Sequence, residues 1–516
     1  MTAASITDTL VARLTDRVSA STSDTLATVD VYGGGTLAKV PHSTPKDVAD
    51  AVEAARVAQK SWATVLLAER IRIFDRFHSL VLEHAETLYD LLQAETGKAR
   101  KDAFLEVSAP LVTVGYYARK AAGLLEPRRR EGMMPVAVRT TELRSPKGVV
   151  GIITPWNYPF ALAFTDLIPA LIAGNAVVLK PDTQTALTTL FGVDLLYQAG
   201  LPQGLLRVVL GDGPVVGTAL VDTADYIGFT GSTRTGRQIA ERAGQRLIGC
   251  SLELGGKNPL LVLEDANLHR AAVGAAQTCF SNSGQLCMSP ERVFVHTAVY
   301  DAFVAKFLAQ VRKIKLTATY DFAADMGSLI SQRQLETVVK HVEDARSKGA
   351  TVLAGGKPRP DIGPFFYEPT VLTDVTPEML CYDNETFGPV VSIYRVVDEN
   401  EAVERANETV YGLNASVFGR DVRKAHDVAA RLRAGTVNIN DGHVVGFGSA
   451  DAPMGGMKDS GLGRRNGAEG LLKYTEAQNV SEQRVPLSAP PGWLPYTLYT
   501  KAMRLTLRLF RRLGLR

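Results

Sequence analysis

Between Gly148 and Gly256 the chain alternates short apolar or β-branched runs with helical stretches. The runs are VVGIIT, AVVLK, LLRVVL and YIGFT, and residues 164–172 form one of the helical stretches between them. Continuous apolar runs of this length are typical of strands that are buried on both faces. Their alternation with helices predicts βαβ units around a buried parallel sheet.

A second region of the same kind runs from Pro259 to about Asn440. Its strand-like runs are PLLVL, RVFVH, TVLAGG, VVSIYRV, NASVFG and GTVNIN. We therefore expect two α/β domains, because a chain of 516 residues is too long for one ordinary core. The segment PVAVRTTELRSPKG, before the first region, alternates like an extended hairpin and belongs to neither predicted core.

Helices are expected ahead of the first sheet. Thr44 can cap a helix with Pro45 in its first turn, and Asp47 completes a capping-box pattern. More helix is predicted from Ala68 onwards, and Gly97 ends it.

The composition is that of an ordinary folded chain, with 46% hydrophobic and 22% charged residues. No apolar run has the length of a signal peptide or a membrane span, so a cytoplasmic location is expected. The formal net charge of the chain is +3, and residues 501–516 hold six cationic residues and no acidic residue. The rest of the chain therefore has a net charge of −3, which argues against nucleic-acid binding. Neither a disulfide framework nor a metal site is expected, because close pairing is absent among the four cysteines, Cys250, Cys279, Cys287 and Cys381.

The segment F-S-N-S-G-Q-L-C, which ends at Cys287, holds the first candidate catalytic residue. A cysteine after a Gly-Gln turn can lie exposed among backbone N–H donors, which lower its pKa and make it a thiolate nucleophile. Taken alone, a free cysteine is more often a small buried apolar residue, so the neighbouring motifs decide.

Two further motifs supply partners for this nucleophile. In S-L-E-L-G-G-K-N-P, Glu253 ends a predicted strand, where a partly desolvated carboxylate can act as a general base. In T-P-W-N-Y-P, Asn157 follows the first parallel strand and can donate its amide to an oxyanion. The ordinary alternatives are a surface ion-pair carboxylate and a turn asparagine.

Together with E-T-F-G-P at 385–389, these motifs resemble the aldehyde dehydrogenase superfamily in order and spacing over roughly residues 30–485. The resemblance implies that Cys287 is the nucleophile and Glu253 the base for hydrolysis, with Asn157 and the backbone N–H of Cys287 as the oxyanion hole. CoA-acylating relatives lack the glutamate, so hydrolysis is expected and not acyl transfer. The implied fold is α/β, with a Rossmann-like cofactor domain at 1–124 and 147–254, a catalytic α/β domain at 255–455, a small β oligomerisation flap at 125–146 and 456–488, and a basic amphipathic tail at 489–516.

The resemblance also places the cofactor. GDGPVVG, at 211–217, mimics a dinucleotide fingerprint with one extra residue and is a weak signal by itself. The pyrophosphate is assigned instead to Gly231, Ser232 and the helix N-terminus after them. The other implied cofactor residues are Trp156 and Lys180 on the adenosine side, Glu385 at the nicotinamide ribose, Phe387 beside the ring, and Asn157, Pro181, Asp182, Thr183 and Leu254.

Thr183 bears on the choice of cofactor. NAD-preferring members of the family usually have a glutamate there, which binds the ribose 2′-hydroxyl and repels a 2′-phosphate. Thr183 with Lys180 nearby tolerates the phosphate, so NADP⁺ is expected. NAD⁺ is the alternative, because Asp182 pointing inward would reverse the preference.

Within the family, the chain looks most similar to a bacterial group of succinate-semialdehyde dehydrogenases, with which it shares K-P-D-x-Q-T, C-F-S-N-x-G-Q-L-C, G-G-K-x-R-P-D-I-G-P and A-P-M-G-G-M. Succinate semialdehyde is the expected substrate. Better-known members hold its carboxylate with arginines at the positions of Thr165 and Ser281, and Arg292 can substitute only if the fold brings it to the pocket. Broad-specificity oxidation of aliphatic or aromatic aldehydes therefore stays open, and a non-catalytic relative is a more remote alternative.

Residues 489–516 form a separate feature. A Pro/Gly break, APPGWLPY, precedes KAMRLTLRLFRRLGLR, whose apolar and arginine residues fall on different sides of a helix. A helix packed on its own protein or on a neighbouring subunit is the ordinary explanation, and peripheral contact of 501–516 with an anionic membrane is the further hypothesis. The family resemblance implies a homodimer or homotetramer, assembled through the predicted hairpin and the strand near Gln478–Val485.

Overall fold

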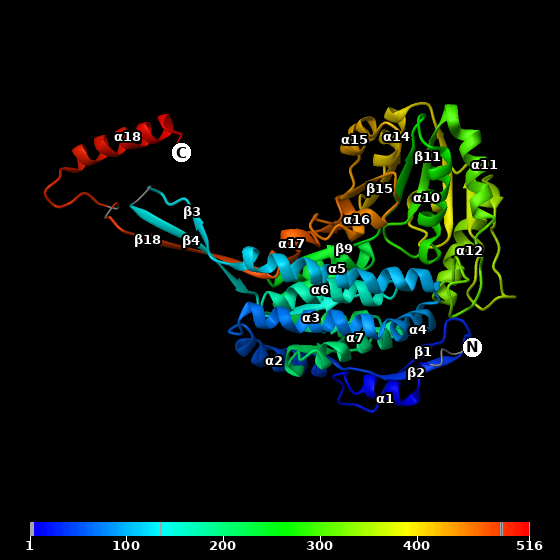
Figure 1. Cartoon of the computed structure of the whole chain (residues 1–516), viewed down its shortest axis with the longest axis horizontal. Helices are drawn as coiled ribbons and strands as arrows, with labels where there is room; N and C mark the ends of the chain where they lie inside the picture. The colour runs from blue at the N-terminus through cyan, green and yellow to red at the C-terminus, as the bar shows by residue number, and fades with distance from the viewer. Residues whose placement is uncertain (1–4, 135–136, 486, 488, 515–516) are drawn as a thin grey trace.

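The computed structural model describes residues 5–134, 137–485, 487 and 489–514. Pro135 and Val136 of the predicted hairpin, and the last two residues of the predicted tail, lie outside these ranges. Within them, the strands form four sheets; two large sheets organise the body and a smaller one builds a projecting arm (Figure 1). None of the helices in the described ranges has the length and apolar character that a membrane crossing needs.

The first large sheet has the strand order β17-β9-β8-β5-β6-β7 and is parallel except where β17 runs against β9. Every strand predicted between Gly148 and Gly256 belongs to it, and β5, β6 and β8 are buried throughout, as expected for strands covered on both faces. The strands are β5 (Val149–Ile153), β6 (Ala176–Lys180), β7 (Leu206–Val208), β8 (Tyr226–Thr230), β9 (Gly249–Glu253) and β17 (Gly461–Leu462).

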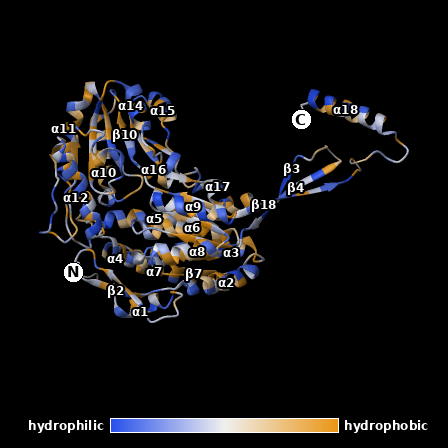
Figure 2. Cartoon of the chain, turned by 180° about the vertical axis from the view of Figure 1, so that it is seen from behind, coloured by the Kyte–Doolittle hydropathy of each residue, from blue (hydrophilic) through white to orange (hydrophobic). Residues whose placement is uncertain are grey.

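Helices pack around this first sheet, and the strongly hydrophobic α6 lies in contact with β5 and β6 (Figure 2). The capping box of Thr44 and Asp47 is confirmed. The helical stretch predicted from Ala68 to Gly97 is confirmed, and it is divided into two helices at His84, which leaves the helical conformation (φ −103°, ψ 19°). The bounds are α2 (Pro45–Trp62), α3 (Leu67–Glu83), α4 (Ala85–Thr96), α5 (Arg100–Leu125), α6 (Pro159–Ile172), α7 (Ala186–Gln198), α8 (Thr218–Thr223) and α9 (Thr233–Gln245).

The second large sheet has the order β12-β13-β14-β11-β10-β15-β16 and is parallel except for the β12–β13 pair. It separates two apolar clusters, and all its strands except β13 were predicted from the sequence. Its strands are β10 (Asn258–Val262), β11 (Pro290–His296), β12 (Thr351–Ala354), β13 (Thr370–Thr373), β14 (Val390–Val396), β15 (Asn414–Phe418) and β16 (Thr436–Ile439). The helices of this region are α10 (Leu268–Phe280), α11 (Tyr300–Val311), α12 (Gln332–Ser347), α13 (Leu380–Asp383), α14 (Glu399–Asn407), α15 (Val422–Arg431) and α16 (Val444–Gly448).

The arm consists of β3 (Arg128–Arg130), β4 (Val138–Pro146) and β18 (Thr475–Gln483) in the order β18-β4-β3, and α18 (Tyr496–Arg512) follows at its far end (Figure 1). β4 and β18 are antiparallel, with Val138 opposite Gln483. The two segments that we expected to pair across subunits therefore pair with each other within one chain. The arm stands away from the body, and none of the residues of α18 is buried.

The predicted domain boundary at 456 differs from the observed pairing. In β17, Gly461 pairs with Glu253, so this segment extends the first sheet. The helix α17 (Gly467–Leu472) then contacts α5 and α6. Residues up to α17 thus complete the body, and the arm begins at β18. The remaining elements are α1 (Asp8–Thr15), β1 (Thr25–Val29), β2 (Thr36–Pro41), η1 (Thr183–Thr185), η2 (Gln203–Leu205), η3 (Gly213–Gly217), η4 (Ser281–Gly284), η5 (Thr297–Val299) and η6 (Lys458–Ser460).

Candidate active site

Asn157, Glu253 and Cys287 come from separate parts of the chain and line one cavity of about 220 Å³, called here the Cys287 cavity. Asn157 lies in the loop between β5 and α6, Glu253 ends β9, and Cys287 follows η4. The cavity borders an apolar cluster formed by side chains of α6 and of the loops around Cys287, Leu413 and Met454. Most of its other lining side chains are apolar, including Leu105, Ala109, Val112, Leu162, Phe447 and Met454.

The loop before Cys287 is held in one conformation. Asn282, Ser283 and Gly284 all have positive φ, and a Cβ on Gly284 would lie 2.0 Å from the carbonyl oxygen of Gly388. Only glycine fits there. The buried side chain of Gln285 donates to the Asn282 carbonyl at 3.2 Å and also accepts a backbone hydrogen bond at 3.0 Å. Cys287 is thereby presented half-buried, not exposed as the sequence suggested.

Asn157 is fixed from two sides. Its Nδ2 donates to the carbonyl of Gln285 at 3.0 Å, and its own carbonyl accepts from Lys98 Nζ at 2.8 Å. Lys98 also forms a fully buried ion pair with Glu106. Glu106 Oε1 in turn accepts the N–H of Phe160 at 2.8 Å, at the start of α6. A buried charge pair with these extra hydrogen bonds fixes the oxyanion-hole candidate against the helix that follows it.

The expected lowering of the Cys287 pKa is contradicted. Burial, with the nearby carboxylates of Glu385 and Glu253, raises the pKa of the thiol to about 12, and Arg465 opposes this only in part. The prediction considered only backbone donors, whereas the fold adds desolvation and two anions. In this arrangement the thiol is protonated near neutral pH and needs a base.

Glu253 has the properties of such a base. Burial raises its pKa to about 7, against the lowering effect of Arg465 and Lys473. A carboxyl group with a pKa near neutrality exchanges protons readily at that pH. It shares the Cys287 cavity with the thiol, so one residue can serve both the thiol and a water molecule.

The residues expected at the pyrophosphate and adenosine ends lie after β6 and β8. Ser232 caps α9, whose first turn carries exposed residues beside it. Lys180 ends β6 and donates to the Pro181 carbonyl at 3.3 Å, and burial lowers its pKa. Thr183 Oγ1 donates to the Gly211 carbonyl at 3.4 Å. The side chain of Leu254 packs on α9, where a Cβ on Gly236 would lie 2.5 Å from it.

Glu385 and Phe387 lie in the segment between α13 and β14. Glu385 Oε1 accepts the N–H of Gly256 at 3.0 Å, and burial raises its pKa to about 8. Phe387 has a positive φ of 53°, held by a hydrogen bond from its N–H to buried Glu291. Its ring meets Trp156 edge to face at 5.5 Å. Trp156 thus lies beside Phe387, and its place with Lys180 on the adenosine side stays a prediction.

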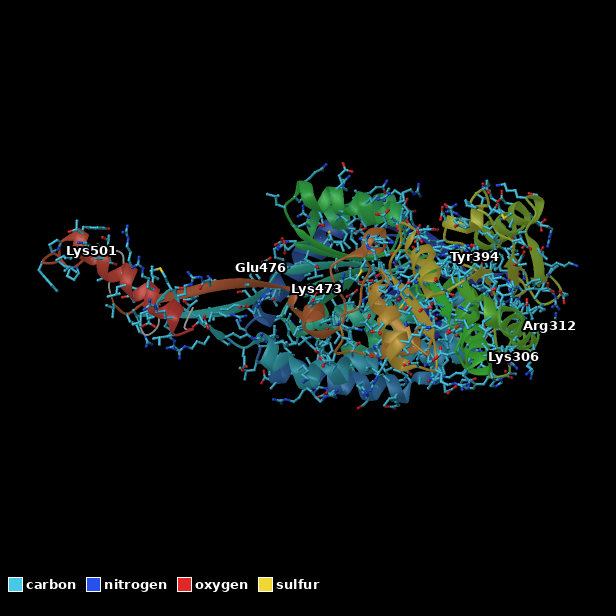
Figure 3. The ribbon with its side chains drawn as sticks, turned by 90° about the horizontal axis from the view of Figure 1, so that it is seen from above. Lys306, Arg312, Tyr394, Lys473, Glu476 and Lys501 are labelled. Carbon is cyan, nitrogen blue, oxygen red and sulfur yellow. The ribbon has the colours of Figure 1, made fainter. Side chains whose placement is uncertain are left out.

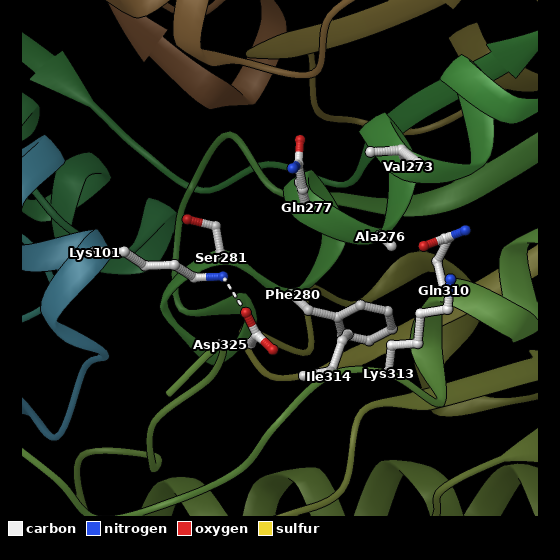
Figure 4. Close-up of a pocket in the computed structure, with 10 residues that line it drawn as sticks. All are labelled: Lys101, Val273, Ala276, Gln277, Phe280, Ser281, Gln310, Lys313, Ile314 and Asp325. Carbon is white, nitrogen blue, oxygen red and sulfur yellow. Dashed lines mark ion pairs between the residues drawn. The ribbon is translucent and has the colours of Figure 1, made fainter. Parts of the chain in front are cut away.

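The three positions considered for a substrate carboxylate do not bring a cation to this cavity. Ser281 donates to Asp102 at 2.9 Å and lines two other cavities, in one of which it lies beside the Lys101–Asp325 ion pair (Figure 4). Arg292 donates to backbone carbonyls and lines a different pocket. Thr165 donates to the Ala161 carbonyl at 2.7 Å and lines a small neighbouring cavity.

Several residues of the site were missed from the sequence. Lys98 and Glu106 support Asn157, Arg465 lines the Cys287 cavity, and Asp166 pairs with Arg465. His443 also lines the cavity, and burial lowers its pKa to about 4, so it is neutral at physiological pH. These side chains carry no motif of their own; only the fold brings them together.

Comparisons with known proteins agree with this geometry. The aldehyde dehydrogenase family profile matches residues 18–480. A protein of Mycolicibacterium smegmatis, named putative succinate-semialdehyde dehydrogenase (NADP(+)), is 56% identical over 484 residues, which cover 94% of each chain. The mitochondrial succinate-semialdehyde dehydrogenase of Oryza sativa subsp. japonica is 35% identical over 452 residues, covering 87% of this chain and 84% of that one.

Solved structures show the same architecture. An NADP-dependent enzyme of E. coli superposes with a TM-score of 0.87 at 33% identity, covering 90% of this chain and 96% of its own. A point mutant of betaine aldehyde dehydrogenase from Staphylococcus aureus, in complex with NAD⁺, also reaches 0.87, at 32% identity and with 93% and 97% of the two chains covered. Since the profile spans nearly the whole chain and the relatives match along most of their length, this chain belongs to the aldehyde dehydrogenase family.

Proposed function

We propose that this chain oxidises succinate semialdehyde to succinate with NADP⁺ as the hydride acceptor, using Cys287 as nucleophile, Glu253 as base and Asn157 in the oxyanion hole. The observation that carries the proposal is that these three residues, chosen from separate motifs, line one buried cavity. Family membership supports the reaction class. The names of the mycobacterial relatives support the substrate and NADP⁺.

The geometry suggests how each residue acts. Glu253 accepts the thiol proton as Cys287 Sγ attacks the aldehyde carbon. The resulting oxyanion accepts hydrogen bonds from the backbone N–H of Cys287 and from the second N–H of Asn157 Nδ2. When bound, the nicotinamide supplies the acceptor for the hydride that leaves this carbon, and Cys287 is left as a thioester. Glu253 first releases the thiol proton to solvent and then takes a proton from the water that attacks the thioester, and the carboxylic acid leaves as the thiolate is restored.

The residues assigned to the cofactor fit a dinucleotide. The capped N-terminus of α9 offers backbone N–H groups to a pyrophosphate. Thr183 is uncharged, and Asp182 accepts the N–H of Gln184 at 3.0 Å. Burial raises the pKa of Asp182 and the nearby charge of Lys180 opposes this rise, so Lys180 partly compensates the carboxylate that a 2′-phosphate would meet. NAD⁺ remains the alternative cofactor, in keeping with the NAD⁺ complex of the staphylococcal neighbour.

Broad-specificity aldehyde oxidation is the second candidate, and the apolar lining of the cavity favours it. The deciding experiment compares kcat/KM for succinate semialdehyde and butanal, each with NADP⁺ and NAD⁺. A preference of at least about 100-fold for the charged aldehyde supports the proposal, since one desolvated charged contact is worth about that factor. Equal values would overturn the substrate and leave a general aldehyde dehydrogenase.

We further propose a cytoplasmic homodimer or homotetramer in which a second copy covers the arm. β18 is an edge strand of the arm sheet, and all its residues after the first are exposed. A long exposed edge is a template for association. Contact of α18 with an anionic membrane is part of the same proposal. This exposed helix carries the apolar side chains of Leu505 and Leu509 together with five of the tail's six cationic residues. A partner subunit covering this helix is the competing explanation.

A further inference from the structure

We propose that the guanidinium of Arg465 binds the carboxylate of the substrate and makes the Cys287 cavity selective for a short aldehyde acid. The inference rests on the proposed oxidation of succinate semialdehyde and assigns the group that recognises its charge. Such a group is needed because Thr165, Ser281 and Arg292 do not place a cation in this cavity.

Arg465 is placed where a substrate can reach it. Its residue is only 2% exposed to bulk solvent, yet it lines the cavity that holds Cys287 and Glu253. Among the described residues lining this cavity, it is the only lysine or arginine. Arg465 also lines the small neighbouring cavity together with Thr165. Arg465, which follows Thr165 by 300 positions in the chain, therefore places a cation in the cavity where Thr165 does not.

In the guanidinium of Arg465, Nη2 has two hydrogen-bond partners, whereas Nε has none among the residues that the structure describes. Nη2 donates to Asp166 Oδ2 at 2.5 Å and to Thr230 Oγ1 at 3.0 Å. Nε is buried and has no hydrogen-bond partner in the described part of the chain. An unfilled buried donor on a charged group is costly, and a carboxylate oxygen is the acceptor that would satisfy it best.

The charge around Arg465 also favours an anionic ligand. Asp166 accepts not only from Arg465 but also from Lys473 Nζ at 2.9 Å and Tyr474 Oη at 3.0 Å. Burial opposes its ionisation, but Arg465 and Lys473 hold the pKa of Asp166 well below its usual range. One carboxylate thus serves two cations. Lys473 lies near the root of the arm in Figure 3. The formal charges of Asp166, Arg465 and Lys473 add up to +1, and when Glu253 is protonated a substrate carboxylate would neutralise this charge.

Arg465 has one competing role, which the test must separate. Its charge lowers the pKa of Glu253 and of Cys287, so it could act on the reaction through ionisation alone. A role of that kind would affect every aldehyde equally and would move the pH profile. A carboxylate contact would affect only substrates with a carboxylate, mainly through KM.

The experiment uses the full chain with three variants. Arg465→Met removes the charge, and Asp166 keeps Lys473 and Tyr474 as partners. Arg465→Lys keeps the charge without the planar fork. Arg270→Met is the matched control. Arg270 donates to the Asn440 carbonyl at 3.1 Å and lines a second cavity, called here the outer cavity, which shares Leu105, His443 and Val444 with the Cys287 cavity. For each, kcat and KM are measured with succinate semialdehyde and butanal across pH.

We expect Arg465→Met to raise KM for succinate semialdehyde about 10- to 100-fold. At pH values above the pKa of Glu253 in both proteins, where the lost charge no longer changes the ionisation of this base, kcat/KM for butanal should change less than about threefold. Arg465→Lys should fall between this variant and the wild type, and Arg270→Met should resemble the wild type. As a binding readout independent of turnover, succinate should slow alkylation of Cys287 by iodoacetamide in the wild type and not in Arg465→Met.

The outcomes separate the two proposals. A wild type that does not prefer succinate semialdehyde over butanal overturns the proposed substrate. A wild type with that preference, combined with an Arg465→Met variant that retains it, overturns only the present inference. Equal losses on both aldehydes with a shifted pH profile also overturn it, because Arg465 would then act through Glu253. A selective loss in Arg270→Met instead would move the carboxylate site to the outer cavity.

Discussion

Asn157 donates its side-chain amide to the backbone carbonyl of Gln285 across 3.0 Å, which joins the loop after β5 to the loop that presents Cys287. Lys98 Nζ donates a hydrogen bond to the backbone carbonyl of the same asparagine at 2.8 Å. Asn157 is therefore a fixed donor and not a mobile turn residue. A donor held before the reaction begins loses little reorganisation energy when the oxyanion forms.

The first prediction concerns Asn157. Replacing it with alanine removes one oxyanion donor, so kcat should fall roughly 10²- to 10³-fold with little change in KM. Steady-state rates with saturating cofactor measure this, and near-UV circular dichroism checks that the loops keep their packing. A variant with normal kcat would show that Asn157 only connects the two loops.

The second prediction concerns Glu253 and pH. Only the deprotonated carboxylate is a base, and its pKa is raised to about 7, so kcat should rise with pH, reach half of its plateau near pH 7 and level off above about pH 8. Glu253→Gln should lose this dependence together with most of its turnover, while still giving one burst of reduced cofactor if another group accepts the thiol proton. Stopped-flow measurement of that burst across pH separates hydride transfer from thioester hydrolysis. A variant that turns over at the wild-type rate contradicts the assignment.

The third prediction concerns the cofactor. Thr183→Glu introduces a carboxylate where a 2′-phosphate is expected, so kcat/KM for NADP⁺ should fall at least about tenfold relative to NAD⁺. Thr183→Gln, with similar size and no charge, is the matched control. If both variants change the NADP⁺ to NAD⁺ ratio equally, charge repulsion at this position does not set the preference.

The fourth prediction concerns the buried pair of Lys98 and Glu106. Lys98→Met leaves Glu106 as a buried carboxylate without its ion-pair partner and removes one of the two hydrogen bonds that the Asn157 backbone carbonyl accepts, so the free energy of unfolding should drop by about 3–5 kcal/mol. Lys101→Met is the control, because Lys101 is half-exposed and its ion pair with Asp325 spans 3.5 Å; it should cost less than about 1 kcal/mol. Urea unfolding at neutral pH compares them.

The fifth prediction concerns the tail. Removing residues 489–516 should abolish binding to vesicles that contain anionic lipid, and the intact chain should bind them more weakly as salt increases. The control replaces the arginines Arg504, Arg508, Arg511 and Arg512 with glutamine and keeps the apolar side of the helix. Equal partitioning of intact and truncated protein would remove membrane contact from the proposal, and a change in subunit number would assign α18 to assembly.

The sequence was sufficient for features that depend on neighbouring residues. The strands of the first sheet, the cap at Thr44 and the left-handed end of α4 at Gly97 follow from local pattern and backbone chemistry. The pairing of Asp166 with Arg465 spans 299 positions and leaves no local trace. The pKa of Cys287 was misjudged for the same reason, since the burial and the carboxylates that raise it come from distant segments.

The return of β17 to the first sheet has a consequence for biosynthesis. Glu253 lies on β9, whose outer edge is completed only by Gly461, and Arg465 follows four residues later. A chain emerging from the ribosome can build the earlier strands long before these residues appear. The nucleophile at position 287 is thus translated well ahead of the segment that finishes its cavity, so substrate oxidation cannot begin until nearly all of the chain has been made.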